Sequence, residues 1–163
     1  MPRFNVRSSA ARPILTRMDL ATAAERLRSA FEGRDEIIFA YVFGSTAQGR
    51  THARSDVDVA VYVEPAALQH AERDSAWGYP AEVTGVAMDG LRMNDVNVVI
   101  LNNAPPLLSD RVARSGRLVL SRDEACRRRW VVQVKSRYCD LAPLRRLLRA
   151  ALEERVRAAR FGT

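Results

Sequence analysis

The 163-residue chain has little of several residue types that mark particular classes of protein. It contains two cysteines, Cys126 and Cys139, in no Cys-x-x-Cys arrangement, which predicts reduced thiols in a cytoplasmic protein. Its two histidines, His52 and His70, have no partners at metal-ligand spacing, and we assign them no role. The sequence therefore indicates neither a disulfide scaffold nor a histidine-based metal site.

Long apolar segments are missing as well. No stretch approaches the roughly 18 uninterrupted apolar residues of a membrane span, and the arginine-bearing start lacks the apolar run of a secretion signal. We interpret residues 1–17 as a flexible N-terminal extension. Residues 18–163 are long enough to bury one substantial core, so we expect a single domain with C-terminal helices and no membrane partner.

Positive charge is concentrated in the last third of the chain. The whole sequence carries a net charge of +7, whereas residues 110–163 contain fourteen Arg and one Lys against six acids, a net +9. Such a surface suits nucleotide phosphates, an acidic protein or nucleic acid, although arginine-rich helix faces are often only solvated. Aromatic residues are not interleaved with the basic ones, which weighs against direct nucleic-acid binding.

Hydrophobic periodicity predicts an α/β (mixed α+β) fold, in which helices flank a small mixed β-sheet. Strands are predicted at residues 37–43, 56–63, 96–101 and, at an edge, 117–120. Helices are predicted at residues 20–31, just after Gly44, around 83–91, from about 103 to Gly116, at 123–140 and, beyond Pro143, at 144–156. Residues 66–94, which include the weakly predicted helix around 83–91, show the least clear pattern, and there we expect Trp77 and Tyr79 to pack in the core or a lid.

Two polar elements stand close together in the first half of the chain. Gly44-Ser45 follows the apolar strand 37–43, and a tight turn there lets backbone N–H groups and a hydroxyl approach a phosphate. Ten residues separate Ser45 from Asp56, and Asp58 follows at i+2, in a strand predicted to be half buried. This spacing points both carboxylates to one face, about 7 Å apart, where they can share a divalent metal ion. A phosphate cradle beside two carboxylates is what metal-assisted nucleotidyl transfer requires.

The order Gly-Ser, ten residues, Asp-x-Asp resembles the signature of the DNA polymerase β-type nucleotidyltransferase superfamily. The small size is similar to that of its minimal nucleotidyltransferase branch, the MntA-like antitoxins, and the resemblance runs from about Asp19 to the C-terminus. It implies a nucleotidyltransferase fold, ATP as substrate and Mg²⁺ as cofactor, with Asp56 and Asp58 as metal ligands. It also implies that Gly44 and Ser45 hold the terminal phosphates.

The chain departs from the family pattern at two positions. Gln48 stands where the pattern Gly-Ser-x-x-Arg-Gly has arginine, which removes one cation near the phosphates. The family carries a third carboxylate before a Leu-Asn-x-Ala-Pro-Pro stretch, found here at residues 101–106, and counting back places Asn97 at the position of that acid. An amide keeps one ligating oxygen but loses the charge and cannot accept a proton.

Two interpretations of the third strand follow. Asp95 lies two residues before Asn97 on the same strand face, and a register shift or bulge would present it instead. Alternatively, the site binds metal through Asp56, Asp58 and Asn97 and has an impaired attack step, since losing a general base costs about 10²–10⁴ in rate. We favour the second interpretation.

The resemblance implies an antitoxin of a two-gene toxin–antitoxin module. Such proteins transfer AMP from ATP to a tyrosine of a partner HEPN-domain ribonuclease, which predicts a hetero-oligomer, and the basic C-terminal helices are a candidate docking face. Two alternatives remain. A degenerate nucleotidyltransferase would neutralise the toxin by binding alone, which Asn97 favours. Transfer to a small-molecule hydroxyl usually needs an added acceptor domain, and only about sixty residues follow the third strand.

Overall fold

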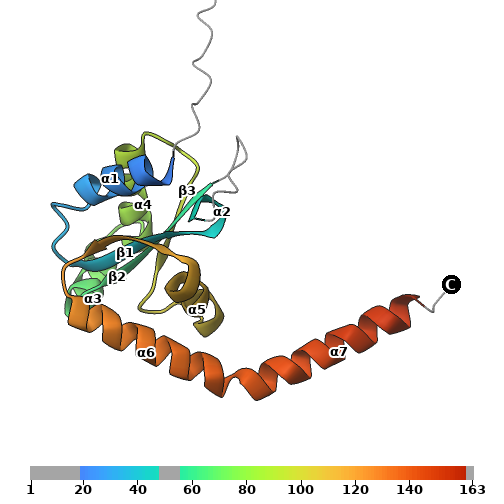
Figure 1. The fold of residues 1–163 in the computed structure, drawn as a ribbon. Coiled ribbons are helices and arrows are strands. Elements are labelled where there is room, and N and C mark those ends of the chain that lie inside the picture. The colour runs from blue at the N-terminus through green and yellow to red at the C-terminus, as the bar shows by residue number, and fades with distance from the viewer. Residues whose placement is uncertain (1–18, 48–55, 161–163) are drawn as a thin grey trace, which may run out of the picture.

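The computed structural model describes residues 19–47 and 56–160, so the predicted extension 1–17 and Gln48 lie outside the described residues. Four strands form one sheet in the order β3-β2-β1-β4 (Figure 1). Their bounds are β1 Ile37–Phe43, β2 Val57–Val63, β3 Val96–Ile100 and β4 Arg117–Ser121. β1 pairs antiparallel with β2 and β4, whereas β2 pairs parallel with β3. The predicted mixed sheet is confirmed, with β4 at an edge.

Helices fill most of the remaining described chain. They are α1 Leu20–Ala30, α2 Gly44–Ala47, α3 Pro65–Asp74, α4 Tyr79–Leu91, α5 Pro106–Ser115, α6 Glu124–Asp140 and α7 Ala142–Arg160. Aspartates begin two of them: Asp19 accepts a hydrogen bond from the Thr22 amide at 2.8 Å, and Asp123 accepts one from the Cys126 amide at 2.8 Å. Each satisfies a backbone donor that the first turn of a helix leaves unpaired.

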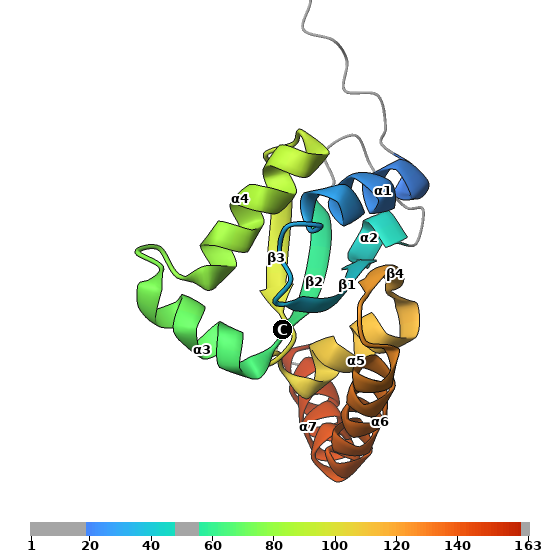
Figure 2. The same ribbon diagram turned by 90° about the vertical axis from the view of Figure 1, so that its left-hand side faces the viewer.

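Both faces of the sheet are covered. Figure 2 shows α1 and α4 on one side of the strands and α5 and α6 on the other. The alternating valines of β2 pack with Leu27 of α1 and Leu91 of α4. On the opposite face Ala60 packs with Val112 of α5 and Trp130 of α6, and it is fully buried. β2 was predicted to be half buried, with its valines in the core, but at Ala60 it is buried on both faces because α5 and α6 cover the second one.

The segment between β2 and β3 contains more helix than the sequence pattern predicts. Glu64 accepts a hydrogen bond from the Ala67 amide at 2.7 Å and starts α3, an element without a predicted counterpart. α4 begins at Tyr79 rather than near Val83. Tyr79 is fully buried, as expected, whereas Trp77 is 89% exposed and so does not pack in the core, which was one of the two places predicted for it.

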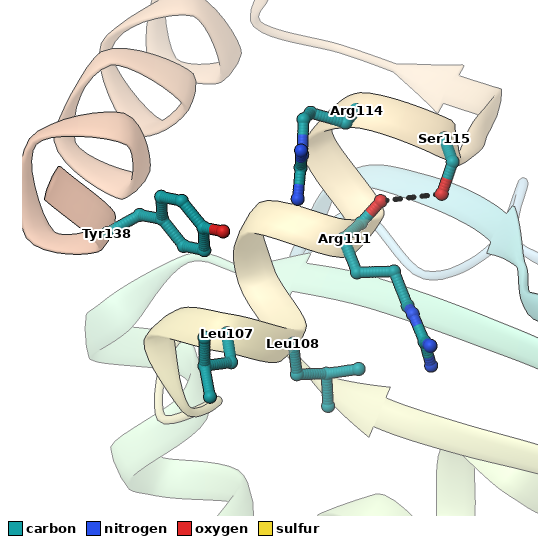
Figure 3. A pocket seen from close by; sticks show the side chains of 6 residues that line it. All are labelled: Leu107, Leu108, Arg111, Arg114, Ser115 and Tyr138. Carbon is teal, nitrogen blue, oxygen red and sulfur yellow. Dashed lines mark hydrogen bonds between the residues drawn. The ribbon is translucent and has the colours of Figure 1, made fainter. Parts of the chain in front are cut away.

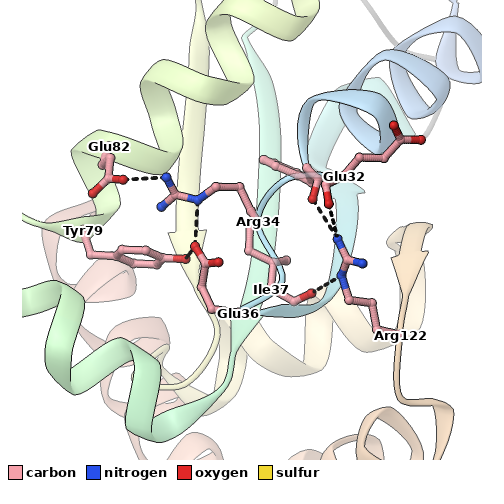
Figure 4. Close-up of polar contacts among 8 residues, drawn as sticks. Glu32, Arg34, Glu36, Ile37, Tyr79, Glu82 and Arg122 are labelled. Carbon is pink, nitrogen blue, oxygen red and sulfur yellow. Dashed lines mark hydrogen bonds and ion pairs between the residues drawn. The ribbon is translucent and has the colours of Figure 1, made fainter.

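Two clusters of polar contacts connect the helices and strands at the edges of the sheet (Figure 4). The Tyr79 hydroxyl donates to Glu36 at 3.0 Å, and the same carboxylate pairs with Arg34 at 2.7 Å. The Arg122 guanidinium, at the end of β4, donates to the backbone oxygens of Phe31 and Ile37 at 2.9 and 3.1 Å. Arg122 thereby ties β4 to the turn between α1 and β1.

The last helix stands apart from the sheet. α6 and α7 meet at Leu141, two residues before Pro143, and α7 then leads away from the other elements (Figure 1). None of the helices within residues 19–47 and 56–160 has the length and apolar character needed to cross a membrane.

Two glycines of α4 provide a matched test of the packing between α1 and α4. A Cβ at Gly90 would lie 2.5 Å from the Ala30 Cβ, whereas a Cβ at Gly85 would meet nothing within 4 Å. We expect Gly90→Ala to lower the free energy of unfolding by about 1–2 kcal/mol through overpacking. Gly85→Ala should raise it by up to about 1 kcal/mol through helix propensity. Urea denaturation measures both, and equal effects would contradict the close approach of the two helices.

Candidate functional site

The end of β1 makes close contact with an acidic side chain of β2. Gly44 follows β1 with a φ of +75°, a conformation that favours glycine. A Cβ at this position would lie 2.1 Å from Oδ2 of Asp58. The glycine of the motif therefore serves two needs at once, since it permits the turn and leaves room for the Asp58 carboxylate over the backbone.

Strand pairing places Asp58 between two neighbours. It lies opposite Phe43 of β1 and opposite Asn97 of β3. Because paired residues point to the same face of a sheet, Asp58 and Asn97 lie side by side. The far end of the pairing is held by Asn102, whose side chain donates to the Val63 carbonyl at 2.8 Å and accepts from the Val63 amide at 3.0 Å. The asparagine of the Leu-Asn landmark thus fixes the strand register.

Asn97 links the two acids of the motif. Its amide Nδ2 lies 3.3 Å from Oδ2 of Asp56. Burial raises the pKa of Asp58, while its hydrogen bond with Asn97 opposes that rise. The negative charge of Asp56 raises the pKa of Asp58 further. Asp56 and Asn97 are exposed, whereas Asp58 is half buried, so the group opens to solvent at the edge of the sheet.

Asp95 occupies a different position from Asn97. It precedes β3, is exposed, and its backbone oxygen accepts a hydrogen bond from the Val57 amide at 2.9 Å. The described pairing of β2 with β3 runs from Val57 and Val96 onward without a shift in register. The bulge that would bring Asp95 beside Asp58 is not found in these strands, and Asn97 takes that place.

Arg111 of α5 is a site residue that the sequence pattern did not identify. Its positive charge lowers the pKa of Asp58. Within the described part of the chain, no ion pair or side-chain hydrogen bond engages its guanidinium. Arg114, one turn later, lies 2.6 Å from Asp110 Oδ2 in an ion pair without hydrogen-bond geometry. Figure 3 shows Arg111 leaving α5 on the side away from Tyr138. More than fifty residues separate Arg111 from Asp58, so only the fold brings the two together.

The donor set at this edge fits a magnesium ion. Asp56 and Asp58 offer carboxylate oxygens, and Asn97 offers an amide oxygen once its side chain turns. Among the described residues, no group of three His, Cys, Asp or Glu side chains is arranged to hold a metal ion. Ser45 lies in α2, directly after Gly44, while Gln48 falls beyond the described residues. The roles assigned to these two residues remain predictions.

The fold and this group of residues define a nucleotidyltransferase domain: a small mixed sheet with a glycine turn at one strand end and an acid pair on the next strand. The family model "Polymerase beta, Nucleotidyltransferase" matches residues 25–125, and the chain belongs to this family. A search of curated proteins gave no match.

Several solved structures share the fold. A chain from a toxin–antitoxin structure with AMP-PNP is 22% identical with a TM-score of 0.64, covering 80% of this chain and 98% of that one. A chain from the MntA–HepT toxin–antitoxin is 19% identical, with a TM-score of 0.60 and coverage of 82% and 98%. A third comes from a tri-AMPylated Shewanella oneidensis HEPN toxin in complex with MNT antitoxin, at 18% identity, a TM-score of 0.59 and coverage of 82% and 98%.

The raised pKa of Asp58 gives a test that needs no substrate. A carboxyl group with a raised pKa in the folded state stabilises the fold at low pH, and that stability is lost as the pH rises through its folded pKa. In a chelating buffer at pH 7, Asp58→Asn should therefore raise the melting temperature. The gain should shrink as the pH falls and Asp58 takes up its proton. A lower melting temperature for Asp58→Asn at pH 7 would contradict the electrostatic description.

Proposed function

We propose that this chain binds ATP with Mg²⁺ at the edge formed by Gly44, Asp56, Asp58 and Asn97. We further propose that it serves as the antitoxin of a HEPN-domain ribonuclease. The observation that supports this most is the contact between Gly44 and Asp58, since it joins the glycine turn and the acid pair of the family in one site. Toxin–antitoxin complexes with AMP-PNP and with an AMPylated toxin share the fold and support the choice of nucleotide and partner.

Each residue of the site has a separate proposed role in nucleotide binding. Asp56 and Asp58 hold Mg²⁺, which when bound neutralises the triphosphate and lines it up for attack. Gly44 lets the backbone approach the terminal phosphates closely. Arg111, whose charge already acts on Asp58, supplies a cation that compensates for glutamine at position 48.

The proposed transfer joins AMP to a tyrosine of the toxin. The tyrosine oxygen attacks the α-phosphorus of ATP, the bond from this phosphorus to the bridging oxygen breaks, and pyrophosphate leaves. The hydroxyl proton passes to water, because Asn97 cannot accept it. Transfer is therefore slower than with a carboxylate at position 97, by the factor of about 10²–10⁴ that a general base provides.

Asn97 also favours a second candidate function, in which the chain silences the toxin by binding alone. One experiment separates the two functions. The purified chain is incubated with labelled ATP, Mg²⁺ and the product of the neighbouring gene, and the products are resolved by mass spectrometry and size-exclusion chromatography. AMP on a toxin tyrosine supports the enzyme, and a stable complex without label supports binding alone. Label on a small acceptor, or no complex and no label, would contradict both functions.

The substitution Asn97→Asp tests the role of the third strand. It restores a carboxylate beside Asp58, which can accept the proton and complete the metal site. We expect the rate of AMP transfer to rise about 10²–10⁴-fold. Added Mg²⁺ should also raise the melting temperature more for this variant than for the wild type, since the extra acid repels Asp58 until the ion binds.

A matched control is Asn103→Asp, which adds the same charge to an exposed position beyond the other end of β3. It should leave the transfer rate unchanged. An unchanged rate in Asn97→Asp, together with loss of activity in Asp95→Ala, would assign the base to Asp95 instead.

The cation at Arg111 is tested by nucleotide affinity. Removal of a charged hydrogen-bond partner costs about 1.5–3 kcal/mol, so Arg111→Ala should weaken ATP binding in Mg²⁺ about 10–150-fold. Arg111→Lys should retain part of the affinity because the charge remains. Arg129→Ala, an exposed position on α6, serves as the control and should bind ATP normally. Isothermal titration calorimetry measures all three, and normal binding by Arg111→Ala would exclude this role.

A further inference from the structure

α7 exposes a continuous apolar seam. Its large apolar residues recur at intervals of three and four residues, which places them along one side of a helix. They are between 51% and 69% exposed, and they are Leu144, Leu147, Leu148, Leu152 and Val156. Soluble proteins seldom leave such a row of large aliphatic side chains uncovered, and contiguous apolar patches of this kind mark interaction sites.

A groove along α5 extends from the base of this helix to Arg111. It has a volume of about 580 Å³ and lies along α5, where Leu107, Leu108, Arg111 and Arg114 line it together with Tyr138 of α6 (Figure 3). Arg145 of α7 lies over the Tyr138 ring, with its guanidinium carbon 3.6 Å from the ring centroid. At 100° per residue Arg145 points to nearly the same side of α7 as Leu152, so the seam leads into the groove.

Charge indicates which partner fits the seam. Residues 124–160, which form α6 and α7, contain eleven basic residues against four acidic ones, a net charge of +7. A second copy of the chain would bring two α7 helices of net charge +4 together, which is unfavourable. Nucleic acid suits the arginines but not a row of leucines, because interfaces with nucleic acid are polar. An acidic protein surface with its own apolar ridge satisfies both features.

We propose that α7 is the docking helix for the acceptor protein of the nucleotidyl transfer. The seam packs against a helical face of that protein flanked by Asp and Glu, and the groove along α5 leads the acceptor segment toward Arg111 and Asp58. This proposal rests on the proposed function, because it assigns the partner surface for the same reaction. It accounts for an amphipathic helix that contributes little to the core of its own chain.

The test uses the full chain and the purified product of the neighbouring gene. The double variant Leu147→Glu/Leu152→Glu should weaken this complex at least about 100-fold. ATP binding should stay normal, since neither residue belongs to the nucleotide site. The control Ala150→Glu adds an acid to the opposite side of the same helix, at an exposed position, and should bind the partner normally. Surface plasmon resonance gives the affinities, and circular dichroism confirms that α7 stays folded.

A charge reversal tests the acidic character of the partner. Arg155 lies on the same side of α7 as the seam, so Arg155→Glu should slow association several-fold. Arg157 lies on the far side of the helix, so Arg157→Glu should leave the association rate unchanged.

A complex that forms equally well with the Leu147→Glu/Leu152→Glu variant would overturn the docking surface and leave the proposed function standing. A wild-type chain that binds ATP but forms no complex with the product of the neighbouring gene would overturn both. Analytical ultracentrifugation of the chain alone supplies a further test. A dimer that the leucine substitutions dissociate would assign the seam to a second copy and overturn the proposal.

Discussion

β2 is hydrogen-bonded on both sides near its first residues, and the site depends on this double pairing. The antiparallel partner brings Phe43, and with it Gly44, next to Asp58, while the parallel partner brings Asn97. A shift of one residue in either ladder would turn Asp58 to the other face of the sheet, where α1 and α4 pack. The valines oppose that shift, because the same slip would remove Val57, Val59 and Val61 from the core that they form with α1 and α4. The buried valines of β2 thus fix the position of Asp58, which lies on the opposite face of the strand.

The layers explain why Asp58 is only partly buried. α5 and α6 cover the sheet at Ala60 and Tyr62, but Asp58 lies nearer the strand end, and Asp56 lies beyond it. The carboxylate consequently loses part of its hydration, which raises its pKa, yet it stays open to a ligand. Arg111 approaches from α5 and balances some of the charge. The helix that buries one end of β2 therefore also supplies a cation to the other end.

Local patterns were sufficient to predict the sheet and the acid pair. β1 was predicted with its observed bounds and β2 within one residue, because the apolar run and the alternating valines are strong signals. α3 was not predicted, since Leu68 is its only large aliphatic residue and the only one that is buried. The burial of Ala60 depends on α5 and α6, which come from a distant part of the chain. Arg111 was not identified for a similar reason, because no spacing within a motif links it to Asp58.

Asn97 changes the electrostatics of the site when no metal is bound. Three carboxylates at one strand edge repel one another and require a cation, whereas an amide donates hydrogen bonds to the two that remain. The amide thus lowers the repulsion between the acids of the metal-free site, and in the proposed function it also removes a group that could accept the proton during transfer. A domain with slow transfer still silences its partner if it holds that partner tightly. In the proposed function the exposed seam of α7 provides the surface for such a complex, so slow transfer and tight binding do not exclude each other.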